Sequence, residues 1–123
     1  MSIARQTEIL ETLAPKSVAP ANFTTANAYA DVTGSKLDAE GKTRVVFTIY
    51  NAHAANSITW KVLASIDDST YIEVEAEATL AAETAASWVA SEVETSYRYF
   101  KIQAKSTVGN SHGTAQVRGY AKM

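Results

Sequence analysis

The sequence predicts an all-β fold, a single β-sandwich of about seven or eight short strands with jelly-roll or Greek-key connectivity. Three observations lead to this prediction. Apolar residues recur at every second position in several stretches, which is the period of a strand. Clusters of turn-forming residues separate these stretches at regular spacing, and the body of the chain has no long run with the helical period.

The clearest alternation spans residues 58–78. Two alternating runs flank the polar segment 67–70, and Glu73, Glu75 and Glu77 fall on the face opposite the apolar residues of the second run. This pattern is typical of an antiparallel hairpin with one buried and one solvent-facing side. The residues expected to face inward are Ile58, Trp60, Val62, Ala64, Ile66, Ile72, Val74, Ala76 and Ala78.

The same period predicts the remaining strands of the sandwich. They are expected at residues 26–32, 43–50, 88–93, 97–105 and 114–121. Segments 34–41 and 78–86 are expected to be connections, and the glycine-containing segment 108–113 a hairpin turn. Trp60 lies on the inward register, so we expect it in the core.

Residues 1–22 differ from the sandwich domain expected at 23–123 and are predicted to form an N-terminal arm. A short amphipathic helix would end before Pro15, because the residue preceding a proline is disfavoured in the helical conformation. An extended linker would follow. The apolar residues of the arm, Ile3, Ile9, Leu10 and Leu13, cannot be buried within so short a segment. They pack on the sandwich, reach a partner, or remain disordered.

Composition excludes several classes of function. The formal net charge of −2 over 123 residues argues against a general nucleic-acid-binding protein, which needs a basic surplus. The absence of cysteine removes disulfides and thiolate chemistry. No apolar run approaches the length of a membrane span, and the first residues lack the apolar core of a secretory signal. We therefore expect a protein made in a cytoplasm, with no membrane partner.

Charge is unevenly distributed along the chain. Every charged residue from Asp67 to Glu94 is acidic, and every one from Tyr97 to Met123 is basic. The two runs could pair across neighbouring strands or across neighbouring copies of the chain. Alternatively, they are solvated outer faces with opposite charges nearby, where single exposed pairs contribute only about 0–1 kcal/mol.

No motif in the sequence predicts catalysis, a cofactor or a metal. His53 and His112 both fall in expected turns, and a zinc site without cysteine would need carboxylates from elsewhere. Segment 67–70 lacks the spaced acidic residues and glycine of a calcium loop. Glu73, Glu75 and Glu77 project from a strand surface rather than into a cleft. We expect a protein that is not an enzyme.

Tyrosines form the one suggestive surface feature. Five of them fall on outward positions of the predicted strands: Tyr29, Tyr50, Tyr71, Tyr99 and Tyr120. Tyrosine is enriched at interfaces, where it supplies a large contact area at low entropic cost. It also favours strands in general, so the pattern is open to both interpretations.

Three segments together resemble a known family. They are 60–67, with the tryptophan strand and an aspartate turn, 71–74, and 97–104, with a Tyr-Arg-Tyr strand. This order resembles the small jelly-roll decoration, or cement, proteins of tailed bacteriophages, and also discoidin-type sugar- or lipid-binding sandwiches. The resemblance spans roughly residues 44–121, and the turn lacks the glycine often found after the aspartate.

The resemblance to decoration proteins implies a homotrimer on the exterior of the virion. Such proteins bind the major capsid protein of the assembled shell and use an N-terminal arm and sandwich edges to bridge its subunits. The arm residues and the outward tyrosines are then the expected partner-binding residues. A carbohydrate-binding module is the alternative, as is another virion piece from the tail, neck or fibre.

Overall fold

The computed structural model describes residues 16–32, 34–109 and 112–123, with the backbone alone for residues 16–22. These residues form nine strands and one 3-10 turn, η1 (Glu94–Ser96). The strands are β1 (Lys16–Thr24), β2 (Ala30–Asp31), β3 (Leu37–Asp38), β4 (Arg44–Asn51), β5 (Ile58–Ser65), β6 (Ile72–Leu80), β7 (Ala85–Val89), β8 (Tyr99–Ser106) and β9 (Thr114–Lys122).

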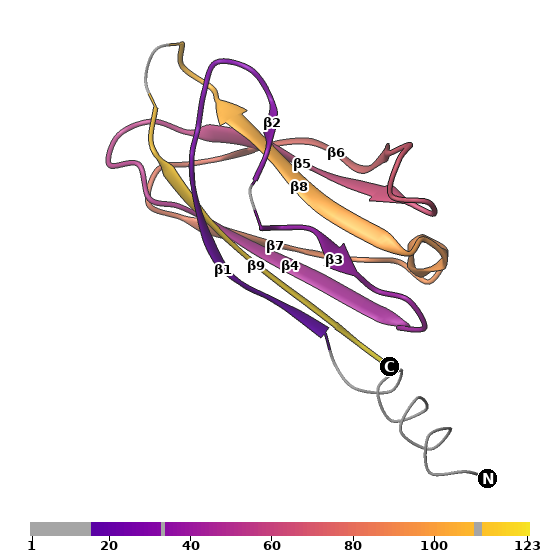
Figure 1. The fold of residues 1–123 in the computed structure, drawn as a ribbon. Coiled ribbons are helices and arrows are strands. Elements are labelled where there is room, and N and C mark those ends of the chain that lie inside the picture. The colour runs from indigo at the N-terminus through magenta and orange to yellow at the C-terminus, as the bar shows by residue number, and fades with distance from the viewer. Residues whose placement is uncertain (1–15, 33, 110–111) are drawn as a thin grey trace, which may run out of the picture.

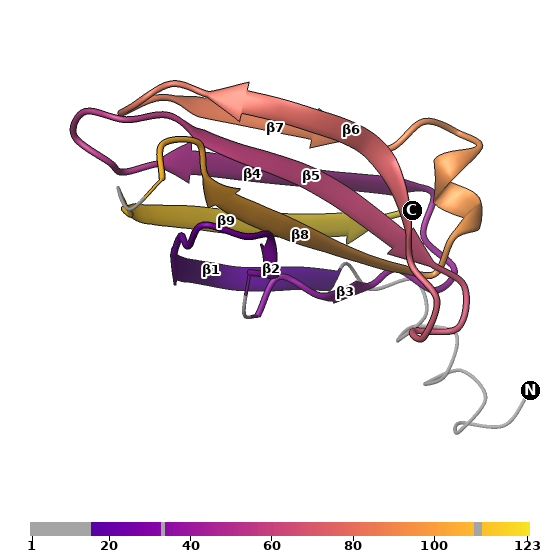
Figure 2. The same cartoon turned by 90° about the horizontal axis from the view of Figure 1, so that it is seen from above.

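Two antiparallel sheets lie face to face and form the predicted β-sandwich (Figures 1 and 2). The first has the strand order β1-β9-β4-β7 and the second β2-β8-β5-β6. β3 also pairs with β8, so β2 and β3 act as one interrupted strand. Counted in this way the sandwich has the eight strand positions of a jelly roll.

An apolar layer between the sheets holds them together. Phe47, Trp88 and Phe100 form its aromatic centre. The Trp88 ring centroid lies 6.3 Å from that of Phe47 in its own sheet and 5.9 Å from that of Phe100 in the opposite sheet. Trp60 is buried, which confirms its predicted place in the core. Apolar burial of this kind is the main favourable contribution to folding.

Strict alternation is confirmed in β4, β8 and β9. In each of these strands every second residue is buried and the residues between are partly or fully exposed. The reason is geometric, because consecutive side chains of a pleated strand leave on opposite sides and only one side meets the other sheet.

The β5–β6 hairpin is confirmed, and the predicted alternation of its second strand is confirmed in part. Val74 and Ala78 pack against the core as predicted, whereas Ile72 is 45% exposed and Ala76 is also exposed. Register shifts lie between Trp60 and Val62 and between Val62 and Leu63, and each adds a residue on the β6 side. One added residue reverses which side chains face inward and the second restores the original side, so the ladder is disrupted locally around Ala76. Ile72 lies on the same side as the buried Ala64 but near the start of an edge strand, where the opposite sheet covers it only in part. Ile66, also expected inside, follows the end of β5 and is 70% exposed.

Other boundaries differ from the sequence prediction. Segment 108–113 is not a hairpin turn, because β8 and β9 belong to different sheets and each pairs with other strands. The strand expected at 88–93 is β7, which starts earlier and ends at Val89. The strand expected at 26–32 is reduced to β2, and the loop expected at 34–41 contains β3.

The sandwich begins earlier than the boundary predicted after residue 22. β1 runs from Lys16 and pairs with β9, so residues 16–22 belong to the first sheet rather than to an arm. β1 is an edge strand, and its register shifts between Val18 and Ala21, around Pro20. Proline is tolerated at such a place because no ladder hydrogen bond depends on its missing N–H. The arm residues Ile3, Ile9, Leu10 and Leu13 lie outside the described residues.

A buried amide closes one end of the sandwich. Asn51 is fully buried at the end of β4, and its Nδ2 donates to the carbonyl oxygens of Asn56 at 3.0 Å, Leu80 at 3.1 Å and Ala81 at 3.2 Å. Its Oδ1 accepts a hydrogen bond from the His53 N–H at 3.0 Å. One side chain thus fixes the β4–β5 connection against the end of β6.

We expect Asn51→Ala to lower the free energy of unfolding by about 2–4 kcal/mol, because it leaves several buried backbone groups without partners. Urea denaturation followed by tryptophan fluorescence measures this loss. Thr79→Ala, at an exposed position of β6, is the control and should change stability by less than about 0.5 kcal/mol. Equal stability of the two variants would contradict this account of Asn51.

Candidate functional site

The outer surface of the β2-β8-β5-β6 sheet, called the paired face below, carries interlocked charges and aromatic rings. Tyr29 lies under two ammonium groups, with Lys61 Nζ 4.2 Å and Lys105 Nζ 4.8 Å from its ring centroid. Lys61 also pairs with Glu73 at 2.8 Å. Such cation–π contacts stabilise a surface by about 0.5–1 kcal/mol each.

A second group of contacts lies where the strand ends of this sheet meet. The Arg98 guanidinium donates two hydrogen bonds of 3.0 Å to the Asp38 carboxylate and pairs with Glu40 at 3.1 Å. The same guanidinium lies 4.8 Å from the Tyr99 ring centroid. The two-pronged contact to Asp38 is the geometry in which arginine binds a carboxylate most strongly.

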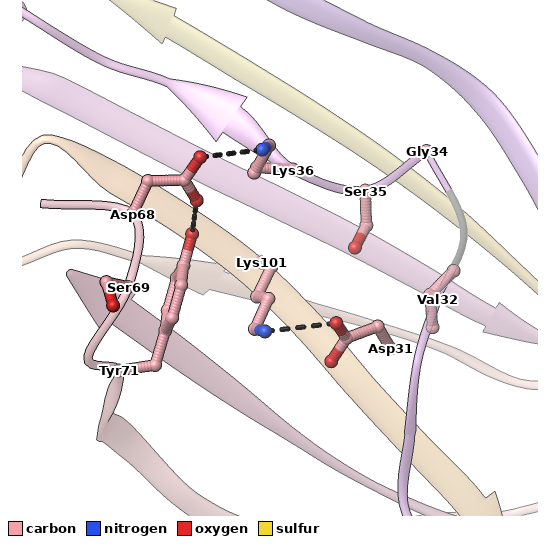
Figure 3. Close-up of a pocket in the computed structure, with 9 residues that line it drawn as sticks. All are labelled: Asp31, Val32, Gly34, Ser35, Lys36, Asp68, Ser69, Tyr71 and Lys101. Carbon is pink, nitrogen blue, oxygen red and sulfur yellow. Dashed lines mark hydrogen bonds and ion pairs between the residues drawn. The ribbon is translucent and has the colours of Figure 1, made fainter.

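The paired face also contains a pocket of about 360 Å³ (Figure 3). Its lining residues are Asp31, Val32, Gly34, Ser35, Lys36, Asp68, Ser69, Tyr71 and Lys101. Figure 3 shows their charged groups turned toward one another. Asp68 pairs with Lys36 at 2.8 Å and accepts a short hydrogen bond from the Tyr71 hydroxyl. Lys101 pairs with Asp31 at 3.0 Å and lies 4.0 Å from the Tyr71 ring centroid.

The groups of this pocket whose pKa values are shifted are all held more firmly in their ordinary charge states. Lys36, and then Tyr71, lower the pKa of Asp68. Partial burial opposes ionisation of Asp31, but Gln103 and Lys101 outweigh it and lower the pKa of that carboxyl. Burial, and then Asp68, raise the pKa of the Tyr71 phenol. None of these shifts places a proton-transfer group near neutral pH, where acid–base catalysis works best.

The Tyr29 phenol behaves similarly. Its hydroxyl is buried without a well-formed hydrogen bond. Burial, followed by the nearby carboxylates of Glu77 and Glu73, raises its pKa. Tyr29 therefore contributes its ring to the face, and its hydroxyl stays protonated at physiological pH.

The outer surface of the β1-β9-β4-β7 sheet, called the basic face below, has the opposite character. Its described charged side chains are all basic and exposed: Arg44, Arg118 and Lys122. Tyr50 and Tyr120 are each 38% exposed, and Val89 is 65% exposed. Val46, paired with both Tyr120 and Val89, completes an apolar row across three strands.

No ion pair involves the three cations of the basic face among the residues that the structure describes. Beside Arg118 the surface is hollowed by about 220 Å³, and the residues around the hollow are Thr48, Ile49, Tyr50, Ala85, Gln116 and Arg118. Exposed aromatic and aliphatic groups next to unpaired arginines are features of protein-binding surfaces.

The five tyrosines predicted to face outward do not form one surface. Tyr50 and Tyr120 lie on the basic face and are exposed. Tyr29, Tyr71 and Tyr99 lie on the paired face, where each is partly covered and in contact with a lysine or arginine. Only the first two have rings available as large contact surfaces.

The two histidines hold turns together. His53 Nδ1 accepts hydrogen bonds of 3.0 Å from the backbone N–H groups of Ala55 and Asn56. His112 Nδ1 lies 2.8 Å from Ser106 Oγ, which donates to Thr25 Oγ1 at 2.8 Å. Ser106 is buried, so this serine–histidine contact serves as a clamp between strand ends.

Among the residues that the structure describes, no group of three histidine or acidic side chains is arranged to hold a metal ion. Within the same residues, no helix has the length and apolar character needed to cross a bilayer.

Four residues of the basic face were not predicted as binding residues from the sequence: Arg44, Val89, Arg118 and Lys122. The sequence does contain a signal for three of them, because Arg44, Arg118 and Lys122 occupy outward positions of strands that carry no acidic residue. The sequence does not show that β4 and β9, which are distant along the chain, are neighbours in the sheet.

Comparison with known proteins shows the fold alone. No protein-family description matches the chain, and no curated protein sequence matches it. The SPBc2 prophage-derived protein YomS is similar in structure, with a TM-score of 0.51, 13% identity, and 88% of this chain and 94% of that chain covered. The PBSX exported protein XepA gives a TM-score of 0.56 and 14% identity over 90% of this chain and 37% of that chain.

A third similar structure comes from Bacillus endospore appendages, which form disulfide-linked pili. It has a TM-score of 0.53 and 12% identity, over 89% of this chain and 88% of that chain. The present chain contains no cysteine, so it cannot form that linkage. Identities this low establish a shared sandwich and leave the function to be argued from the surfaces.

The lowered carboxylate pKa values predict the response of stability to acid. Asp31, Asp67 and Asp68 all have pKa values below the ordinary 3.8, so their stabilising contribution is complete above that value. It is lost as pH falls through the lower folded-state values. We expect urea midpoints to be equal at pH 7 and pH 5 and lower at pH 3. The urea midpoint of the Asp31→Asn, Asp68→Asn double variant should fall less between pH 5 and pH 3, because two of these carboxylates are absent. A native chain whose midpoint is as high at pH 3 as at pH 5 would contradict the lowered pKa values.

Proposed function

We propose that this protein is a structural component of a bacteriophage particle. In this role it binds the outer surface of the assembled capsid as a homotrimer and stabilises the shell. The observation that carries the proposal is the contrast between its two outer faces. On one face lysines and an arginine pair with carboxylates of the same face. The other face presents cations that make no ion pair among the described residues, beside exposed tyrosine and valine side chains.

The character of the larger pocket supports a binding role over a catalytic one. Its carboxylates are paired with lysines, and the perturbed pKa values move away from neutrality. Catalytic sites show the opposite tendency, since their acids and bases are tuned toward the working pH. We propose that this pocket stabilises the paired face and that the protein is not an enzyme.

Two of the similar structures support a phage origin. YomS is described as prophage-derived, and XepA as an exported protein of PBSX. Both share the sandwich with this chain at low identity, so they support the context and do not specify a role.

Stabilisation of a capsid would follow from mass action. A protein that binds only the assembled shell shifts the equilibrium toward that shell, by about 2.7 kcal/mol per site when its free concentration is a hundred times Kd. Many symmetry-related copies add such contributions over the particle. The apolar arm residues Ile3, Ile9, Leu10 and Leu13 would supply further contacts with the major capsid protein.

The test is heat protection of capsids from the phage or prophage that encodes this chain. We expect the pure protein to co-sediment with empty capsids and to raise their disruption temperature by several degrees, measured by light scattering. Free capsid subunits should not bind, because the proposed binding site exists only on the assembled shell. Absence of co-sedimentation at micromolar concentrations would refute the proposed function.

A truncation tests the arm separately. Deletion of residues 1–14 leaves every described strand in place, so the truncated chain should retain its sandwich and its thermal unfolding transition. We expect its protection of capsids from heat to be lost. Undiminished protection would show that the arm has no part in binding.

Glycan binding is the second candidate function, favoured by Tyr50 at the rim of the hollow with Gln116 and Arg118 beside it. An aromatic ring next to hydrogen-bonding side chains can stack on a sugar. Tyr50→Ala should then abolish retention on a glycan array without changing the oligomeric state. Tyr99→Ala, which affects the paired face, is the matched control and should retain glycans normally.

A further inference from the structure

Strand β7 is an unprotected edge of the first sheet. It is five residues long and pairs with β4 alone, in a register without a shift. A sheet edge presents backbone N–H and C=O groups that can pair with a further strand, and proteins block this with charges, prolines, bulges or very short strands. β7 has the sequence Ala-Ala-Ser-Trp-Val, so it carries neither a charge nor a proline.

The other edges of the described sandwich are protected. β1 contains Pro20, with a register shift around it. β6 carries Glu73, Glu75 and Glu77, and two register shifts interrupt its pairing with β5. β2 and β3, which share the remaining edge, are two residues long each. β7 is therefore the edge on which the described strands place no obstacle to pairing.

Hydrogen bonds at both ends of β7 show which of its backbone groups point away from β4. The Ala90 N–H donates to the Val45 carbonyl at 2.9 Å. At the other end the Asn51 N–H donates to the Thr84 carbonyl at 2.9 Å. In an antiparallel ladder, residues bonded in this way alternate with residues whose N–H and C=O point to the opposite side. The outward residues of β7 are therefore Ala85, Ser87 and Val89.

These three residues leave a row of backbone groups open. All three are exposed, Val89 to 65%. Their outward N–H and C=O groups make no hydrogen bond within the part of the chain that the structure describes. Their side chains lie on the basic face, because Val89 is the cross-strand neighbour of Val46 in the apolar row. The edge therefore offers both hydrogen-bonding groups and apolar area.

We propose that β7 pairs antiparallel with β7 of a second copy of this chain, about a twofold axis at Ser87. In this register Ser87 lies opposite the same residue of the second copy, and Ala85 lies opposite Val89 in both directions. Each of these residue pairs exchanges both of its backbone hydrogen bonds. The contact is isologous, and the two four-stranded sheets become one continuous sheet.

A second copy fits this edge because the strand is complementary to itself. The number of outward residues is odd, so a twofold axis through the middle one gives every outward group a partner. The strand is uncharged, so no like charges meet within it. The apolar row ends at Val89 in one copy and would continue into Ala85 and then Tyr50 of the second. The axis is perpendicular to the sheet, so both basic faces lie on the same side of the dimer.

This contact is separate from the proposed function. Three copies around a threefold axis of a capsid need a different surface of the chain. On a capsid, the β7 contact would join a copy in one trimer to a copy in the neighbouring trimer.

The absence of cysteine allows single-cysteine variants of the full chain to test the register. Hydrogen-bonded cross-strand residues have Cα atoms about 5.5 Å apart, within the range of about 4.4–6.8 Å that a disulfide spans. Under mild oxidation Ser87→Cys should give a covalent dimer on a non-reducing gel. Ala85→Cys and Val89→Cys are the matched controls and should not, because like residues lie about 14 Å apart along the strand. An equimolar mixture of these two controls should cross-link, because the two positions lie opposite each other.

Charge at the twofold axis gives an independent test. We expect sedimentation velocity of the native chain to show a dimer whose fraction rises with protein concentration. Ser87→Lys and Ser87→Glu should each remain monomeric, because the axis places like charges directly opposite. A mixture of these two variants should form the heterodimer. Thr79→Lys, at an exposed position of β6, is the control and should dimerise like the native chain, and circular dichroism should show every variant folded.

Several outcomes would overturn the proposal. Equal cross-linking of the three single-cysteine variants would indicate random collisions, and no cross-linking would show that the edge does not pair. A native chain that is monomeric, and whose Ser87→Lys variant alone loses binding to capsids, would assign β7 to a strand of the capsid protein instead of a second copy. Failure of the native dimer to bind capsids would contradict the proposed function and leave this contact standing.

Discussion

The apolar layer between the two sheets is the constraint on which the rest of the structure depends. Trp88 contacts Phe47 within its own sheet and Phe100 across the interface, so one side chain joins both layers. Because this layer takes one side of each strand, the alternate residues must face outward. The chemistry of both outer faces is therefore a consequence of strand registers that the core has already fixed.

The two outer faces use that constraint differently. On the paired face, lysines and an arginine lie over tyrosine rings and bind carboxylates from segments distant in sequence, so many of its charges have partners within the same face. On the basic face, β4 and β9 bring Arg44 and Lys122 together as cross-strand partners, and neither makes an ion pair with a described residue. Internal neutralisation is characteristic of a stabilising surface, whereas retained charge of one sign favours binding to a complementary surface.

The hairpin turn between β5 and β6 illustrates how local chemistry supports this arrangement. Asp67 Oδ1 accepts backbone hydrogen bonds from Ser69 at 2.9 Å and Thr70 at 3.0 Å, which fixes the turn. Asp68 adopts a φ of 60°, a conformation usually taken by glycine. In this conformation its side chain binds Lys36 and Tyr71, which line the pocket of the paired face.

The sequence by itself determined the fold class, the strands with strict alternation and the burial of Trp60, because a period of two is a local property of the chain. It also determined that the acidic and basic residues are segregated. Only the tertiary structure decided that Tyr50 and Tyr120 share a surface apart from the other tyrosines, that Ile66 and Ile72 face solvent, and that residues 16–22 join the sheet. These features depend on bulges and on pairing between distant strands, and neither leaves a periodic trace in the sequence.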